Sequence, residues 1–302
     1  MNLGRRAASD RQRGKRCALA LLFGVVLVGC KIGEGGGGGG GGGTTGPCGT
    51  VSSNESWAAP GDALSEWASV QVPAGTTDRL QSIPAPSGGV GRAFQVDVRD
   101  GDVAVNSGGQ PIPGGWRAEG IGPTEAESSR VIRYEWNTRF DPQYPTNPVG
   151  TDGKPIWQVF AQWHQGDGEA GSFPPVAFII ENGGLWLDIS KINPNDPTTS
   201  IDLPNHRVAD LDPGQWHHFR VDVKWSLTHG CIAVWHDDKL IHESPDIATL
   251  YPAGTSAPKV SQPGTVYLKM GLYRKPTSMG PAGTKFVLHH DEVKRLAEPG
   301  IN

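Results

Sequence analysis

Alternation of apolar and polar residues with a period of two recurs along this 302-residue chain, and such a pattern predicts β-strands. Glycine, proline, asparagine and aspartate separate the runs, and the short segments at residues 182–184 and 228–230 predict hairpins. The 43 glycines and 25 prolines agree with many short strands joined by tight turns. We therefore expect two packed antiparallel sheets, with loops over residues 193–212, 252–263 and 276–283. The alternating runs are residues 93–98, 129–140, 156–164, 176–180, 185–189, 217–225, 231–235, 266–273 and 285–293.

The N-terminal residues differ from the rest in composition. Basic residues precede an apolar run, Ala18 to Val28, that is too short to cross a bilayer as a mature helix and is typical of a signal peptide. The run leads to Cys30 in a sequence that resembles the lipobox of bacterial lipoproteins, although an ordinary signal peptide containing a cysteine is the alternative. We expect a signal peptide with its lipobox over residues 1–30, a glycine-rich flexible linker over 31–46 and a folded domain over 47–302.

This organisation predicts an exported bacterial lipoprotein at the outer membrane or cell surface, attached to the membrane only through its lipid. Cys48 and Cys231 are the cysteines of the expected domain, and in an oxidising compartment we expect them to pair; two free thiols are the alternative. Without the first 30 residues the chain has 21 basic and 30 acidic residues, which excludes nucleic acid as the expected partner. An anionic ligand would need a local basic cluster.

Two alternating segments place polar groups together on one face. In residues 156–164 we expect one set of side chains in the core and the other, with two amides and an imidazole, in a sugar-binding groove. The core set is Trp157, Val159, Ala161 and Trp163, and the groove set is Gln158, Phe160, Gln162 and His164. A merely solvated strand face is the alternative for Gln162 and His164.

The second segment, residues 266–273, places Tyr267, Lys269 and Tyr273 on one side, with apolar residues facing inward. A glycine inside a strand indicates close approach by a backbone or a ligand, and we expect Gly271 to open space beneath a sugar ring. Half-buried structural tyrosines are the alternative. Arg117 and Glu119 share a strand face farther upstream and are expected to form an ion pair, which could be structural.

In this order, four motifs resemble those of the heparin lyase I-like and glucuronan lyase-like polysaccharide lyases, over about residues 80–296. The motifs are Arg117-Ala118-Glu119, Gln162-Trp163-His164, Gly214-Gln215-Trp216-His217 and the Tyr-x-Lys-x-Gly-x-Tyr run from Tyr267 to Tyr273. The resemblance implies an all-β, concanavalin-like β-jelly-roll sandwich with a concave substrate groove. It also implies β-elimination at a uronic acid, which gives 4,5-unsaturated oligosaccharides. Alginate lyases carry comparable motifs, so the polymer stays open.

The resemblance also implies the roles of individual residues. His164 and Tyr273 are expected to be the base and acid, in either order, while Arg117 and Gln162 neutralise the carboxylate of the sugar. Lys269 is expected beside the phenol of Tyr273, where its charge would favour phenolate. The expected substrate contacts are Lys269, Tyr267, Glu119, Gln158 and Arg274.

Two other functions are compatible with such a sandwich, a non-catalytic lectin-like module and a glycoside hydrolase. A hydrolase needs two carboxylates flanking the bond, whereas the glutamates lie on separate expected strands. No cofactor and no catalytic metal are expected, because adjacent histidines such as His217 and His218 point to opposite faces of a strand. A structural calcium ion is compatible with acidic loops at Asn195 to Asp196 and Asp210 to Asp212. We expect a monomer that binds an anionic polysaccharide.

Overall fold

The computed structural model describes residues 43–59, 64–165, 174–193, 195–255, 265–279 and 285–298. Cys30, the expected signal peptide and most of the expected linker lie outside the described residues. No helix in the described part of the chain is long and apolar enough to cross a membrane. The first strand of the described residues begins at Thr44, inside the segment expected to be linker.

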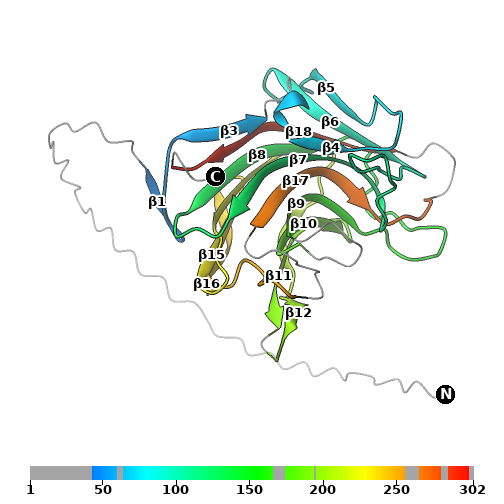
Figure 1. Cartoon of the computed structure of the whole chain (residues 1–302). Coiled ribbons are helices and arrows are strands. Elements are labelled where there is room, and N and C mark those ends of the chain that lie inside the picture. The colour runs from blue at the N-terminus through cyan, green and yellow to red at the C-terminus, as the bar shows by residue number, and fades with distance from the viewer. Residues whose placement is uncertain are drawn as a thin grey trace, which may run out of the picture. The chain divides into compact units, whose positions relative to one another are not determined.

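Two antiparallel sheets form the domain, which confirms the predicted β-jelly-roll sandwich (Figure 1). We call the first the front sheet; its strands are ordered β12-β11-β10-β9-β17-β7-β4, with β13 paired to β11. Its strong curvature is visible in Figure 1. The front-sheet strands are β4 (Ser69–Gln71), β7 (Trp116–Ala126), β9 (Gln158–Gln165), β10 (Val176–Glu181), β11 (Gly184–Asn193), β12 (Asp196–Asp202), β13 (His206–Asp210) and β17 (Thr265–Arg274).

The second sheet, here the back sheet, has the order β16-β15-β14-β8-β18-β6-β5, with β3 paired to β18. A short hairpin and one 3-10 turn complete the described elements. The back-sheet strands are β3 (Glu55–Ala59), β5 (Leu80–Pro84), β6 (Arg92–Arg99), β8 (Ile132–Phe140), β14 (Trp216–Lys224), β15 (Gly230–His236), β16 (Lys239–Ile247) and β18 (Lys285–Leu296). The hairpin is β1 (Thr44–Gly46) and β2 (Gly49–Val51), and the turn is η1 (Leu64–Glu66).

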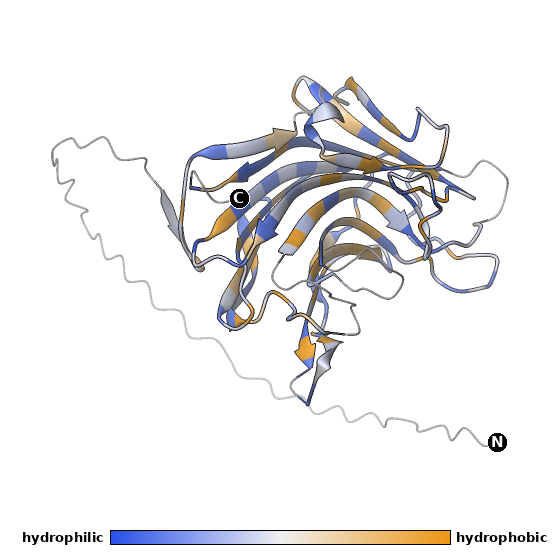
Figure 2. Ribbon diagram, in the orientation of Figure 1, coloured by the Kyte–Doolittle hydropathy of each residue, from blue (hydrophilic) through white to orange (hydrophobic). Residues whose placement is uncertain are grey.

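Aromatic side chains from both sheets fill the space between them. The ring of Trp136, from the back sheet, stacks on Phe219 at a centroid distance of 5.2 Å and meets Phe178, from the front sheet, edge-on at 5.3 Å. All three are fully buried. Such rings contribute much of the apolar area that a sandwich removes from water. Figure 2 shows the resulting bands of alternating hydropathy along the strands. Polar residues are therefore displayed mainly on the outer faces.

A predicted hairpin turn and a predicted disulfide both have the expected form. Asn182 and Gly183 have φ angles of 50° and 69° and join β10 to β11 in a tight hairpin turn of the kind that requires positive φ. Cys48 and Cys231 form a disulfide, which confirms the predicted pair. The bridge joins the β1–β2 turn to the outer face of β15. A hydrogen bond of 2.9 Å from the guanidinium of Arg133 to the hydroxyl of Thr44 also holds the hairpin there.

The prediction of a loop over residues 193–212 is wrong, because β12 and β13 lie within it. Both strands pair with β11 at the end of the front sheet. Their side chains are largely exposed or half-buried, so they do not need the apolar alternation by which a core strand is recognised. Strands β1 to β5 and β16 were not predicted either.

Candidate active site

Three neighbouring strands, β9, β17 and β7, bring the motif residues together on the outer face of the front sheet. Lys269 of β17 lies opposite Gln162 of β9, and Tyr267 lies opposite His164. On the other side of β17, Tyr273 lies opposite Arg117 of β7. Antiparallel pairing therefore gathers side chains separated by more than a hundred residues. We call this set the catalytic group; it consists of Arg117, Glu119, Gln162, His164, Tyr267, Lys269 and Tyr273.

Glu119 lies at the centre of the catalytic group. Its carboxylate is 2.8 Å from Nζ of Lys269 and 3.5 Å from a guanidinium nitrogen of Arg117, and it accepts a 2.7 Å hydrogen bond from the amide of Gln162. Burial acts to raise the pKa of Glu119, but Lys269 and Arg117 outweigh it and the pKa is lowered. The carboxylate is therefore ionised, and the predicted pair of Arg117 and Glu119 exists as part of a larger network.

His164 is positioned by a tyrosine. Its Nδ1 lies 3.1 Å from the hydroxyl of Tyr267, and 9% of the residue is exposed. Burial lowers the pKa of His164 to about 3, helped by the positive charges of Lys269 and Arg117 and opposed by Glu119. The ring is therefore neutral near pH 7 and can accept a proton. When Nδ1–H donates to Tyr267, the basic lone pair of the ring is on Nε2.

Tyr273 is protonated at neutral pH. Burial raises its pKa, and Arg117, whose guanidinium lies 4.0 Å from the ring centre, acts in the opposite direction. The expectation that Lys269 favours phenolate is wrong, because its ammonium pairs with Glu119. The ring also meets Trp157 edge-on at 4.9 Å, and a Cβ at Gly115 would lie 2.3 Å from Cε2 of Tyr273. Its position is thus fixed from several sides.

A β-bulge in β9 changes which residues reach this face. Phe178 of β10 pairs with Ala161 and the next residue pairs with Val159, so Phe160 is the extra residue of the bulge. The alternation shifts by one there. Phe160 is buried in the core, whereas Trp157 is 38% exposed, so the predicted assignment of faces is correct after the bulge and wrong before it.

The structure does not bring two of the expected substrate contacts to this face. Gln158 is fully buried, and its amide oxygen accepts a hydrogen bond from Tyr144. Arg274 is also fully buried, 2.5 Å from a carboxylate oxygen of Asp100, with its guanidinium over the rings of Trp116 and Phe286. Both side chains have structural partners in the interior, so we do not retain them as substrate contacts.

A glycine is required at position 271 for a different reason from the one expected. Its φ angle is +146°, and a Cβ at this position would lie 2.1 Å from the carbonyl oxygen of Ala118 in β7. Real atoms never approach so closely, so the glycine permits the close contact of two backbones. The expectation that it opens space beneath a sugar is wrong.

The fourth motif belongs to the back sheet. Gly214 has a φ angle of +92° and donates a backbone hydrogen bond to Phe140, and the indole of Trp216 donates to the carbonyl of Ser87 at 3.2 Å. This turn stabilises the entry to β14 rather than contributing to the catalytic group. His217 and His218 point to opposite faces, as predicted. The partner of His217 is His236, on the neighbouring strand.

An acidic residue beyond the motifs also faces the catalytic side of the sheet. Asp188 of β11 and Gln162 of β9 lie on either side of Ala177, which pairs with both. Burial raises the pKa of Asp188 to about 6, and the negative charge of Asp202 adds to this. Sequence reasoning missed Asp188, although its alternation with the core residues Leu185 to Ile189 was a usable signal.

Comparison with known proteins identifies the family of the chain and supports its fold. A sequence model of the family described as Polysaccharide lyase matches residues 58–294. Among solved structures, an endo-β-1,4-glucuronan lyase from the fungus Trichoderma reesei shares 16% identity, with a TM-score of 0.58 over 82% of this chain and 98% of that one. An alginate lyase from Corynebacterium sp. shares 13% identity, with a TM-score of 0.47 over 75% of this chain and 92% of that one. No curated protein sequence matches the chain. The likeness to the fungal structure establishes a shared fold.

Proposed function

The chain is a polysaccharide lyase, since it belongs to the family whose model matches residues 58–294, and on this premise we propose that it cleaves a uronic-acid polymer by β-elimination. One observation carries the proposal: a neutral imidazole and a protonated phenol lie on one sheet face beside a buried, positively charged group. The products would be 4,5-unsaturated oligosaccharides.

Charge neutralisation comes first in this chemistry. The C5 proton of a uronic acid is weakly acidic, because its removal places more negative charge beside a carboxylate. Arg117 and Lys269 carry more positive charge than Glu119 neutralises, and Gln162 has a second amide hydrogen beyond the one that Glu119 accepts. These groups would bind the sugar carboxylate and stabilise the charge that develops on it.

His164 and Tyr273 then carry out the proton transfers. We assign His164 as the base that takes the C5 proton, because it is unprotonated, and Tyr273 as the acid, because it is protonated. The electrons of the C5–H bond form the C4–C5 double bond, the C4–O bond breaks, and the departing oxygen takes the phenolic proton. The bound carboxylate raises the proton affinity of His164 during the step. Protein groups perform every transfer, so the proposed chemistry requires no cofactor.

The two alternative functions lack the same support. A glycoside hydrolase needs two carboxylates flanking the bond, whereas in the described catalytic group Glu119 is the one carboxylate and it is held by cations. A lectin would bind the polymer and form no double bond. Family membership favours the lyase over both.

A panel of uronate polymers, including glucuronan, alginate and heparin-like chains, would test the proposal through the ultraviolet absorbance of the new double bond. We expect His164→Ala and Tyr273→Phe each to lower turnover at least ~100-fold, the low end of general acid-base contributions, with folding retained. His229→Ala, at an exposed position in the connection between β14 and β15, is the matched control and should keep full activity. Full activity in both catalytic variants, or binding without absorbance, would contradict the proposal.

We further propose that the protein is an exported lipoprotein, acylated at Cys30 and acting as a monomer at the bacterial outer membrane or cell surface. The apolar run before Cys30 and the glycine tract after it support this, and so does the disulfide, which persists in oxidising compartments. Metabolic labelling with a fatty acid should mark the wild type and not Cys30→Ser.

A further inference from the structure

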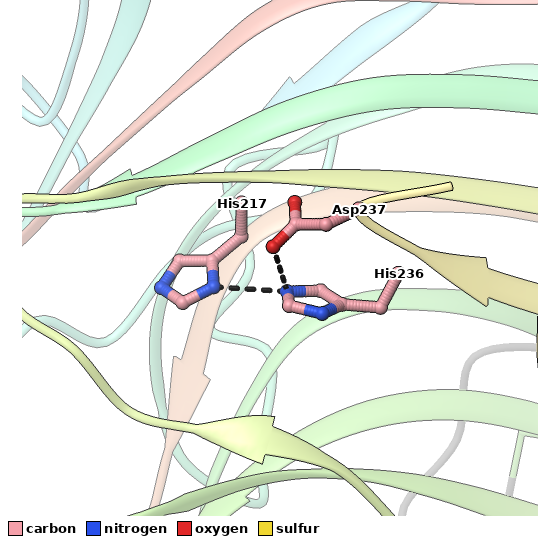
Figure 3. Close-up of side chains that lie close together, drawn as sticks. All are labelled: His217, His236 and Asp237. Atoms are coloured by element: carbon pink, nitrogen blue, oxygen red, sulfur yellow. Dashed lines mark hydrogen bonds and ion pairs between the residues drawn. The ribbon is translucent and has the colours of Figure 1, made fainter. Parts of the chain in front are cut away.

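Three side chains with metal-binding atoms meet at one edge of the back sheet, outside the catalytic group. Nδ1 of His217 lies 3.0 Å from Nε2 of His236, and the same Nε2 lies 3.4 Å from Oδ2 of Asp237. Figure 3 shows the three side chains pointing toward one another. In the described part of the chain, this is the one group of three or more histidine, cysteine or acidic side chains whose ligand atoms all lie within 4.8 Å.

The backbone holds these groups in place. His217 is buried, with its ring centre 6.0 Å from that of Phe140. Asp237 lies in the tight turn between β15 and β16, where its φ angle is 47°. Its backbone N–H donates to the carbonyl of His218, and the N–H of His218 donates to Oδ1 of Asp237, both at 2.9 Å. One carboxylate oxygen is thus fixed by the backbone, and the other is directed at His236.

We propose that His217, His236 and Asp237 bind one divalent transition-metal ion, with zinc the ion that the donor set fits best. Ligands at 2.0 to 2.1 Å from a tetrahedral zinc ion are about 3.3 Å apart, close to both measured separations. Two imidazole nitrogens and one carboxylate oxygen are donors that zinc accepts, and water would complete the tetrahedron.

The surroundings favour entry of an ion. The side chain of His236 is 13% exposed and that of Asp237 is 56% exposed, so the site opens to solvent on one side. Because two of the ligands belong to neighbouring strands and the third to the adjoining turn, a bound ion would hold this edge of the back sheet together.

A simple hydrogen bond between the two imidazoles is the competing explanation. It accounts for the 3.0 Å separation of the rings but assigns no role to Oδ2 of Asp237. Replacing Asp237 therefore distinguishes a metal site from a simple hydrogen bond between the imidazoles. The Asp237→Asn replacement keeps an acceptor for the His218 N–H and a residue type that tolerates positive φ, so the turn should survive it.

The full-length protein, stripped with a chelator and dialysed, would be titrated with Co²⁺ and then with Zn²⁺. We expect one equivalent of Co²⁺ to bind with the visible absorption of a tetrahedral complex, and Zn²⁺ to displace it. Asp237→Asn and His236→Gln should each weaken binding at least about tenfold, as loss of groups around a metal typically does. His218→Gln is the matched control, because its ring is directed toward Asp238 on the other face, and it should bind like the wild type.

Two results would overturn the proposal: no stoichiometric binding by the wild type, or equal affinity in the wild type and Asp237→Asn. The second result would leave only the imidazole pair. If His236→Gln fails to fold, Asp237→Asn decides the matter, since that side chain lies in an exposed turn.

Discussion

Glu119 determines the electrostatics of the catalytic group although it is placed at neither proton-transfer step. Lys269 and Arg117 would repel each other in a buried site, and the carboxylate between them removes much of that repulsion. The same carboxylate holds the amide of Gln162. We therefore regard Glu119 as a positioning residue that keeps cations available for an anionic sugar.

Replacing Glu119 by Gln should destabilise the fold by about 3 to 5 kcal/mol, because removing one partner leaves buried charge uncompensated. Urea unfolding of the two proteins would measure the difference. Glu135→Gln is the matched control: its nearer partner Lys294 is 36% exposed, and its more distant partner Arg133, at 3.8 Å, keeps Asp222. Partly solvated ion pairs of this kind contribute about 1 kcal/mol or less. Equal losses in the two variants would show that the Glu119 network has no special importance.

Asp188 makes stability depend on pH. Its pKa is about 6 in the folded protein and 3.8 in its unperturbed state, so the folded protein binds the proton more tightly. The favourable contribution is complete below pH 3.8 and is lost as the pH rises through 6. Asp188→Asn should therefore be close to wild type at pH 4 and more stable at pH 8, by up to about 3 kcal/mol.

Thermal unfolding at the two pH values would test this. Asp238→Asn, whose side chain is 94% exposed, should show no such gain. A pH-independent difference for Asp188→Asn would contradict the assignment.

At the scale of single strands, β17 carries three catalytic-group residues, and its backbone passes very close to β7. The contact depends on Gly271, where no side chain fits against Ala118. Gly271→Ala should therefore cost at least about 2 kcal/mol, more than the usual penalty of a left-handed alanine. Gly109→Ala is the control, because its φ is also positive but its Cβ would meet nothing within 4 Å. Chemical denaturation would compare them, and equal losses would contradict the close-contact explanation.

The two site strands show how far local patterns predict structure. In β17 the alternation holds throughout, so Tyr267, Lys269 and Tyr273 were placed on the correct face. In β9 an extra residue shifts the alternation, and nothing local signals it, because Phe160 and Ala161 are both apolar and both buried. Gln158 was misplaced for this reason.

Contacts between residues of distant strands could not be predicted from local sequence patterns. The pairing of His217 with His236 depends on how β14 aligns with β15, and the contact of Gln162 with Glu119 depends on β9 and β7 flanking the same strand. Sequence order identified the motif residues, but the register of the strands decided which of them touch.

At the scale of the whole domain, the catalytic group and the disulfide lie on different sheets. The catalytic group lies on the front sheet, whereas the disulfide joins the N-terminal hairpin to the outer face of the back sheet. The bridge closes a loop of 183 residues. Cross-links of this kind restrict the unfolded chain, so replacing both Cys48 and Cys231 by Ser should lower stability by about 2 to 5 kcal/mol.

Calorimetry of the double variant against the wild type would measure the loss. The intrinsic activity at low temperature should change little, because the bridge is on the opposite sheet from the catalytic group. A large fall in activity without a fall in stability would contradict this separation.

The position of the bridge also has a mechanical consequence. Any pull on the chain ahead of Thr44 reaches the domain within a few residues of Cys48 and passes through a covalent bond into β15. If a long polymer drags on the enzyme while its N-terminal end is held, the load bypasses the hydrogen bonds of the small hairpin. Such a load enters at the front sheet, where the polymer is bound, and leaves through β15, so it passes across the packed sandwich.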